Sequence, residues 1–172
     1  MPAEEVKNSS TPGKLEPWLN LTDTAIKYTE GFNLNGVVAT TDGRYLLTAQ
    51  SNTGNLYRID TQTRQVTPVD LEGAKLTNGD GQVLKGDTLY VVRNQGLITK
   101  VSLDSLDGEF PSGQVEGNTL VPHPEDLPTT AALVRGRLLV VNSQFAEEGP
   151  ADNPEVLDPP EKPFTVSALP AP

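Results

Sequence analysis

A repeated pattern of strand, glycine turn and strand constrains the fold of this chain more than any other feature of its sequence. The pattern occurs in three segments, which are NGVVATTDGRYLLTAQ, DGQVLKGDTLYVVRN and TAALVRGRLLVVNSQF. Each segment holds two short runs rich in Leu, Val or Tyr, which favour β-strands, on either side of a turn glycine. The turn glycines, Gly43, Gly86 and Gly136, are 43 and then 50 residues apart. This period is typical of the blades of a β-propeller.

The first two repeats continue in parallel. NTGNLYRID and RQVTPVDL follow the first, and NQGLITKVSLD and GQVEGNTLV follow the second, so each predicts four antiparallel strands. The third repeat supplies two strands, and PFTVSAL at 163–169 supplies a third. GKLEPWLNL at 13–21 reads as a single strand ahead of the first blade. Together these strands predict an all-β fold of about three four-stranded propeller blades, half of a six-bladed ring.

The two ends of the chain are complementary in this prediction, because the strand at 13–21 can complete the last blade. Three blades would still form an open arc with exposed sheet edges, which promote association. We therefore expect either a homodimer that closes a six-bladed ring or a piece of a longer chain that supplies the other half. Residues 1–12 are expected to form a disordered or extended tail, and 13–172 the half-propeller. The acidic, Pro-rich stretch at 146–162 is expected to be an irregular loop within it.

Composition excludes several classes of function. The net charge is −10, and no cluster of Lys and Arg is present, which argues against a nucleic-acid partner. The absence of cysteine excludes disulfides, thiolate nucleophiles and zinc ribbons. No apolar run approaches the ~20 residues of a membrane-spanning helix, and MPAEEVKNSS lacks the apolar core of a signal peptide. We therefore expect a soluble chain with no membrane partner, in a compartment that the sequence leaves open.

The repeats also resemble a known family. GFNLNGVVATTDGRYLLTAQSNTGNLYRID, NGDGQVLKGDTLYVVRN, LPTTAALVRGRLLVVNSQF and PEKPFTVSALPAP are similar to segments of the gluconolactonase family, which includes senescence marker protein and the strictosidine-synthase-like propellers. The resemblance runs from about residue 13 to the C-terminus and corresponds to the later half of the family's six-bladed ring. It implies a divalent cation, often calcium, at the centre of the ring. It also implies a metal-dependent hydrolase that acts on a lactone or a small ester.

The resemblance assigns roles to particular residues. Asn35 of the first Asn-Gly step and Asp80 of the Asp-Gly step match the family's metal ligands, and Asp80 would also be the catalytic base. Oxygen ligands suit a hard cation, and the following glycine lets the backbone approach closely. Asn78, Thr129 and Thr130 are the candidate substrate contacts. The family's first-blade Glu ligand has no counterpart in this sequence, and two ligands are too few for a cation that is normally bound by about six oxygens.

Simpler interpretations stand beside these roles. Asn, Asp and Gly are common turn formers, so Asn35, Asn78 and Asp80 could each serve a turn. His123, the single histidine, is flanked by prolines and is expected at the surface, which makes a copper, iron or manganese site poorly supported. No Gly-x-Ser-x-Gly elbow or phosphate-binding loop is present. The alternative to a hydrolase is therefore a non-catalytic propeller module that binds a ligand or partner, or a fragment with an incomplete site, and the sequence leaves enzymatic activity open.

Overall fold

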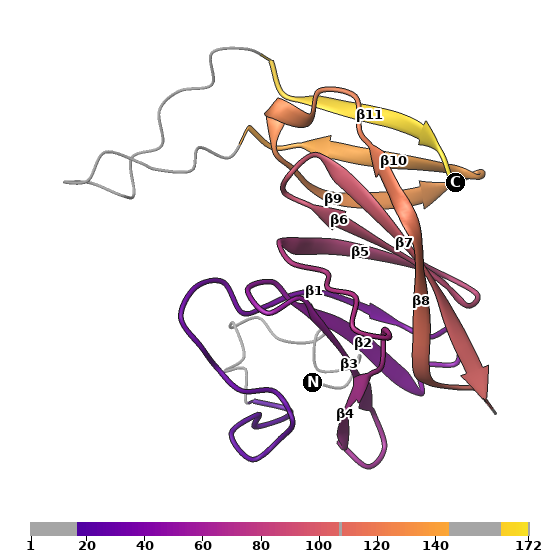
Figure 1. The fold of residues 1–172 in the computed structure, drawn as a ribbon. Coiled ribbons are helices and arrows are strands. Elements are labelled where there is room, and N and C mark those ends of the chain that lie inside the picture. Colours follow the sequence, from indigo (N-terminus) through magenta and orange to yellow (C-terminus); the bar gives the residue numbers. More distant parts are fainter. Residues whose placement is uncertain (1–16, 107, 145–162, 172) are drawn as a thin grey trace, which may run out of the picture.

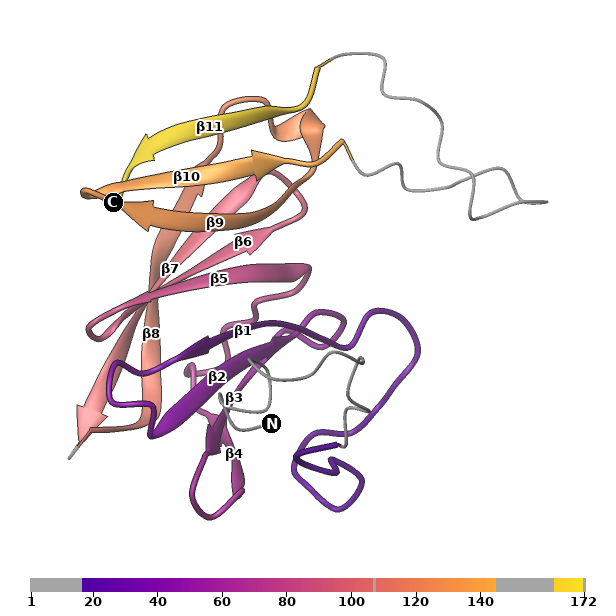
Figure 2. The same cartoon turned by 180° about the vertical axis from the view of Figure 1, so that it is seen from behind.

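The computed structural model describes residues 17–106, 108–144 and 163–171. These residues form eleven β-strands and one short 3₁₀ helix, arranged as three antiparallel sheets (Figure 1, and from behind in Figure 2). The predicted tail at 1–12 and the predicted loop at 146–162 lie outside the described residues. No helix in the described ranges is long and apolar enough to cross a membrane.

The strands follow the predicted repeats. Blade 1 contains β1 (Leu34–Ala39), β2 (Tyr45–Gln50), β3 (Asn55–Asp60) and β4 (Val66–Val69). Blade 2 contains β5 (Gly79–Lys85), β6 (Thr88–Arg93), β7 (Leu97–Leu106) and β8 (Glu109–Leu120). Blade 3 follows the 3₁₀ helix η1 (Pro124–Asp126) and contains β9 (Pro128–Val134), β10 (Arg137–Asn142) and β11 (Thr165–Pro170). Within each blade, strands that are consecutive in the chain pair antiparallel, so the predicted all-β fold is confirmed.

The strand predicted at 13–21 is wrong for the residues that the structure describes. Residues 17–21 form a bend and extended chain without strand pairing, and 13–16 lie outside the described ranges. A local turn competes with pairing here, because Asn20 Oδ1 accepts hydrogen bonds from the Thr22 N–H at 3.0 Å and the Thr22 hydroxyl at 2.7 Å. Blade 3 therefore has three strands in the described part of the chain, in the order β11-β10-β9.

The segment 17–33 instead lies against blade 1. Its Ile26 is buried, with 5% of its surface exposed. Gln50 of β2 donates a side-chain hydrogen bond to the Lys27 carbonyl at 2.9 Å. The Asn52 side chain likewise donates to the Glu30 carbonyl at 2.7 Å. The segment thus covers the face of blade 1 that points away from blade 2.

Two apolar clusters join the blades, and β6 contributes to both. Leu89 and Val91 pack into the cluster between blades 1 and 2, whereas Tyr90 and Val92 pack into the cluster between blades 2 and 3. Successive side chains of a strand point to opposite faces, so a strand that is covered on both faces needs an unbroken apolar run. The run LYVV meets this requirement and places blade 2 between its two neighbours.

The inner strands β1, β5 and β9 lie side by side in that order (Figure 1). At the outer edge, β8 crosses toward β4, where the Asp70 N–H donates to the Pro111 carbonyl at 3.0 Å and the Gly113 N–H donates to the Asp70 carbonyl at 2.8 Å. Arg58 and Glu109 form an ion pair of 3.1 Å between the same two blades. These contacts hold blades 1 and 2, which carry the candidate site, in place relative to each other.

Candidate functional site

Each inner strand has a β-bulge near its beginning. The residues paired with the last residues of β2, β6 and β10 are Leu34, Gly79 and Pro128. The register shifts directly after the pairs of Gly79 and Pro128, and one pair later in β1, after Asn35 has paired with Ala49. In each case the inner strand has one residue more than its partner. A bulge redirects the side chains beside it. The next residues, Asn35, Asp80 and Thr129, therefore occupy equivalent positions in three successive blades.

These three equivalent residues line one cavity of about 570 Å³. The cavity is lined by Phe32, Asn35, Ser51, Asn78, Asp80, Asn94, Gln95, Leu127 and Thr129. The structure thus brings together four of the five residues that the sequence singled out. The fifth, Thr130, is exposed on β9 and is not among the lining residues.

Asp80 is held by a residue that the sequence reasoning missed. The side-chain Nδ2 of Asn94 donates to Asp80 Oδ2 at 2.8 Å and makes a longer contact of 3.4 Å with the Pro128 carbonyl. Asn94 directly follows β6, just as Ser51 follows β2 and Ser143 follows β10. A comparison of the residues after the second strand of each repeat would have identified it.

Ser51 and Asn94 serve the same structural purpose in successive blades. The Ser51 hydroxyl donates to the Gly79 carbonyl at 2.5 Å, and Asn94 contacts the carbonyl of Pro128, the residue equivalent to Gly79. Each therefore bonds the first residue of the next inner strand. This repeated bond fixes the point at which Asp80 and Thr129 enter the cavity.

The glycines of the Asn-Gly and Asp-Gly steps allow neighbouring inner strands to approach. A Cβ at Gly36 would overlap the carbonyl oxygen of Asp80, and a Cβ at Gly81 would lie 2.6 Å from the Cα of Thr130. The sequence suggested that these glycines let the backbone approach a bound ion. In the structure they let the backbone of one blade approach that of the next.

Asn78 combines a turn with a place in the cavity wall. Its φ is 58°, in the left-handed region that Asn tolerates better than most residues. Its N–H donates to the Ser51 carbonyl at 2.8 Å, and its own carbonyl accepts from the Asn94 N–H at 3.1 Å. The predicted turn role is therefore confirmed. Its side chain remains a candidate ligand contact.

The cavity contains both side chains that the resemblance assigned to a cation. Asn35 and Asp80 supply oxygens of the kind that a hard cation prefers. However, Asn35 Oδ1 already accepts the Gly36 N–H at 2.9 Å, and Asp80 Oδ2 is bonded to Asn94. The described residues contain no group of three or more His, Cys, Asp or Glu side chains that could together hold a metal ion. His123 is exposed, as predicted, and does not line this cavity.

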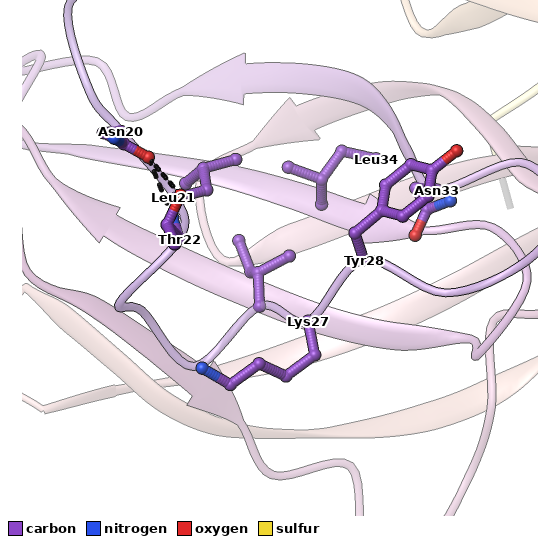
Figure 3. A pocket seen from close by; sticks show the side chains of 8 residues that line it. Asn20, Leu21, Thr22, Lys27, Tyr28, Asn33 and Leu34 are labelled. Carbon is purple, nitrogen blue, oxygen red and sulfur yellow. Dashed lines mark hydrogen bonds between the residues drawn. The ribbon is translucent and has the colours of Figure 1, made fainter.

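A second cavity of about 440 Å³ lies between the segment 17–33 and blade 1 (Figure 3). Its walls include the apolar residues Leu21, Ile26 and Leu34. Two of its polar groups, Asn20 and Thr22, bond to each other, as the dashed lines of Figure 3 show. It contains none of the residues that the sequence predicted for a site.

The architecture follows from the antiparallel strand order within each sheet and from the inner strands, which lie next to one another. The chain folds as β-propeller blades. No protein-family model matches it, and no curated protein matches it. A similar solved structure is the β-propeller domain of Cps50 (Swd1) from Myceliophteria thermophila, with a TM-score of 0.46 and 17% sequence identity. The match covers 63% of this chain and 36% of that domain, so the chain spans about a third of its length. Membership of the gluconolactonase family stays a prediction.

Proposed function

We propose that this chain forms part of a ligand-binding cavity in a β-propeller, and that the ligand is a small neutral molecule rich in hydroxyl and carbonyl oxygens. One observation carries the proposal. Asn35, Asp80 and Thr129 occupy the same position in three successive inner strands and line the same cavity. The chemical class includes sugar-derived lactones.

The lining chemistry favours this class of ligand. Asn35, Asn78, Asn94 and Gln95 supply amide groups that both donate and accept hydrogen bonds. Asp80 supplies the acceptor for a ligand hydroxyl, and its bond to Asn94 fixes the position of the carboxylate. The Phe32 side chain is 79% exposed at the cavity and offers an apolar surface for the C–H face of a sugar ring.

A gluconolactonase-like hydrolase is the second candidate. It is favoured because Asn35 and Asp80, the two residues that match the family's metal ligands, both line this cavity. In that role the Asp80 carboxylate would accept a proton from the water that attacks a lactone carbonyl. Asn35 and Asp80 alone are too few for a cation that is normally bound by about six oxygens, so a cation-dependent reaction would need further oxygen ligands beside them.

Titration of the ¹⁵N-labelled protein with glucono-δ-lactone, a neutral ligand, tests the binding proposal, and its anionic hydrolysis product gluconate is the charged comparison. We expect saturable shifts of the amides at Asn78, Asp80 and Asn94, and loss of these shifts in Asp80→Asn. Asp87→Asn is the matched control, because Asp87 is an exposed carboxylate in the β5–β6 turn, away from the cavity lining. An unperturbed spectrum of the wild-type protein, or equal effects of the two variants, would contradict the proposal.

The hydrolase candidate has a separate readout. Lactone hydrolysis, followed at constant pH against the spontaneous rate, should be accelerated with added calcium and return to background with a chelator or in Asp80→Asn. Binding without acceleration would leave the ligand-binding module as the function. Acceleration that survives Asp80→Asn would exclude Asp80 as the base.

A further inference from the structure

Strand β11 ends blade 3 with an open edge in the described part of the chain. In blades 1 and 2 a fourth strand, β4 or β8, pairs beyond the third strand. Val141 pairs with Val166 as Ala49 pairs with Leu56, so Val166–Leu169 corresponds to the stretch Leu56–Ile59. That stretch of β3 is the one that pairs with β4. Blade 3 therefore has a defined place for one further short strand.

The direction of the backbone groups on this edge follows from one hydrogen bond. The Ala171 N–H donates to the Gly136 carbonyl at 3.0 Å, across the β10–β11 ladder. Backbone groups alternate sides along an antiparallel strand. The N–H and C=O of Val166 and Ala168 therefore point to the open edge. Pro170 also falls on this side, where the lack of an N–H breaks no bond to β10.

The outer edges of the other blades carry protection against pairing within the strand, whereas on β11 it is limited to Pro170, the last residue of the strand. β4 is four residues long and contains Pro68. β8 has two register irregularities against β7 and carries Glu116. Proline, charge and bulges are the usual devices that prevent edge association. The sequence from Pro163 to Ala171, PFTVSALPA, contains no charged residue.

We propose that β11 pairs antiparallel with β11 of a second copy of this chain, so that two blades 3 form one continuous sheet. The fourth strands of blades 1 and 2 run antiparallel to the third, and a twofold axis between identical strands gives the same direction. An axis at Ser167 pairs Val166 of each copy with Ala168 of the other. The same register sets Phe164, which is 64% exposed, against Pro170 of the second copy.

Two observations favour this contact over head-to-tail closure of a ring. The segment 17–33 already covers the outer face of blade 1, where its buried Ile26 and the Lys27–Gln50 hydrogen bond lie. Thr130 occupies the position that is glycine in the first two blades, and its Cβ opposes the close approach of a further inner strand. At the edge of β11, neither the segment 17–33 nor the Thr130 side chain stands in the way of a second copy. The proposal is independent of the ligand that the cavity binds.

Light scattering on a sizing column over a range of concentrations tests the proposal. We expect the wild-type chain to reach twice its mass of 18.4 kDa. Ala168→Pro removes an N–H that points to the edge and leaves the β10 ladder intact, so dimerisation should weaken at least tenfold. Val166→Lys should do the same through charge repulsion. Val37→Lys, at a valine of almost equal exposure (62% against 61%) on β1, is the matched control and should remain dimeric.

Amide hydrogen exchange provides a second measurement that does not depend on variants. The Val166 and Ala168 amides should become protected as the protein concentration rises. A wild-type protein that stays monomeric would overturn the proposal. A dimer that Val37→Lys disrupts and Val166→Lys does not would place the contact on blade 1 and favour a closed ring. Circular dichroism establishes that each variant is folded before its mass is interpreted.

Discussion

The side-chain amide of Asn94 donates a hydrogen bond of 2.8 Å to the carboxylate of Asp80. The two residues come from the ends of neighbouring strands in blade 2, and both line the cavity. An ionised acceptor makes this bond stronger than a neutral one. The bond keeps the carboxylate oriented before any ligand arrives.

Substitution of Asn94 should therefore affect Asp80 directly. Asn94→Ala should lower the free energy of unfolding by about 1–2 kcal/mol, because it removes a hydrogen bond to a charged group. Asn94→Asp places two carboxylates together, which raises the pKa of one of them. Its stability deficit should therefore be largest near neutral pH and shrink as the pH falls toward 4, as measured by urea denaturation across that range. A deficit in Asn94→Asp that does not vary with pH would mean that the two side chains are not in contact.

The close approach of the inner strands predicts a difference between two glycine substitutions. Gly81→Ala places a methyl group 2.6 Å from the Cα of Thr130 and should cost roughly 3 kcal/mol or more. Gly86→Ala is the control, since the turn has open space around it and only its φ of 56° opposes alanine. It should cost about 1 kcal/mol. Equal losses in chemical denaturation would show that the inner strands are not in tight contact.

The stability of blade 1 should depend on pH through Asp60. Hydrogen bonds from the backbone N–H groups of Thr63 and Gln62, together with Arg44, hold the pKa of Asp60 below its usual value, although burial opposes the shift. A lowered pKa in the folded state means that the stabilisation is complete above the pKa of the unfolded chain, about 4, and is lost as the pH falls through the folded value. Denaturation between pH 7 and pH 3 should show a shallower loss for Asp60→Asn than for the wild type. Parallel curves would contradict the assignment.

The cluster between blades 1 and 2 should dominate the stability of the described fold. Leu89 has no exposed surface, so Leu89→Ala should destabilise by about 2–5 kcal/mol. Leu106, which is 66% exposed at the end of β7, is the matched control, and Leu106→Ala should change the stability by less than about 0.5 kcal/mol. Thermal or urea denaturation of the two variants measures the difference.

Most of the architecture could be predicted from the sequence, because the strands and turns of each blade follow from short apolar runs and turn glycines. Apolar runs and turn glycines located all eleven described strands, and the repeat aligned Asn35 with Asp80 on one cavity. Asn94 was missed because its importance depends on a side chain fourteen residues away that only the bulged register brings near. The strand at 13–21 was predicted from the short run GKLEPWLNL ahead of the first blade, and the bonds between Asn20 and Thr22 oppose it.

β6 packs against an apolar cluster on each of its two faces, and this affects how the protein unfolds. Its residues Tyr90 and Val92 face one neighbour, while Leu89 and Val91 face the other, so blade 2 cannot open without exposing both clusters. In repeat architectures, stability propagates through such shared interfaces. The amides of β6 should therefore exchange only through global unfolding, whereas those of the outer blades exchange through partial openings as well. The middle blade thus acts as the cooperative unit on which the lifetime of the cavity depends.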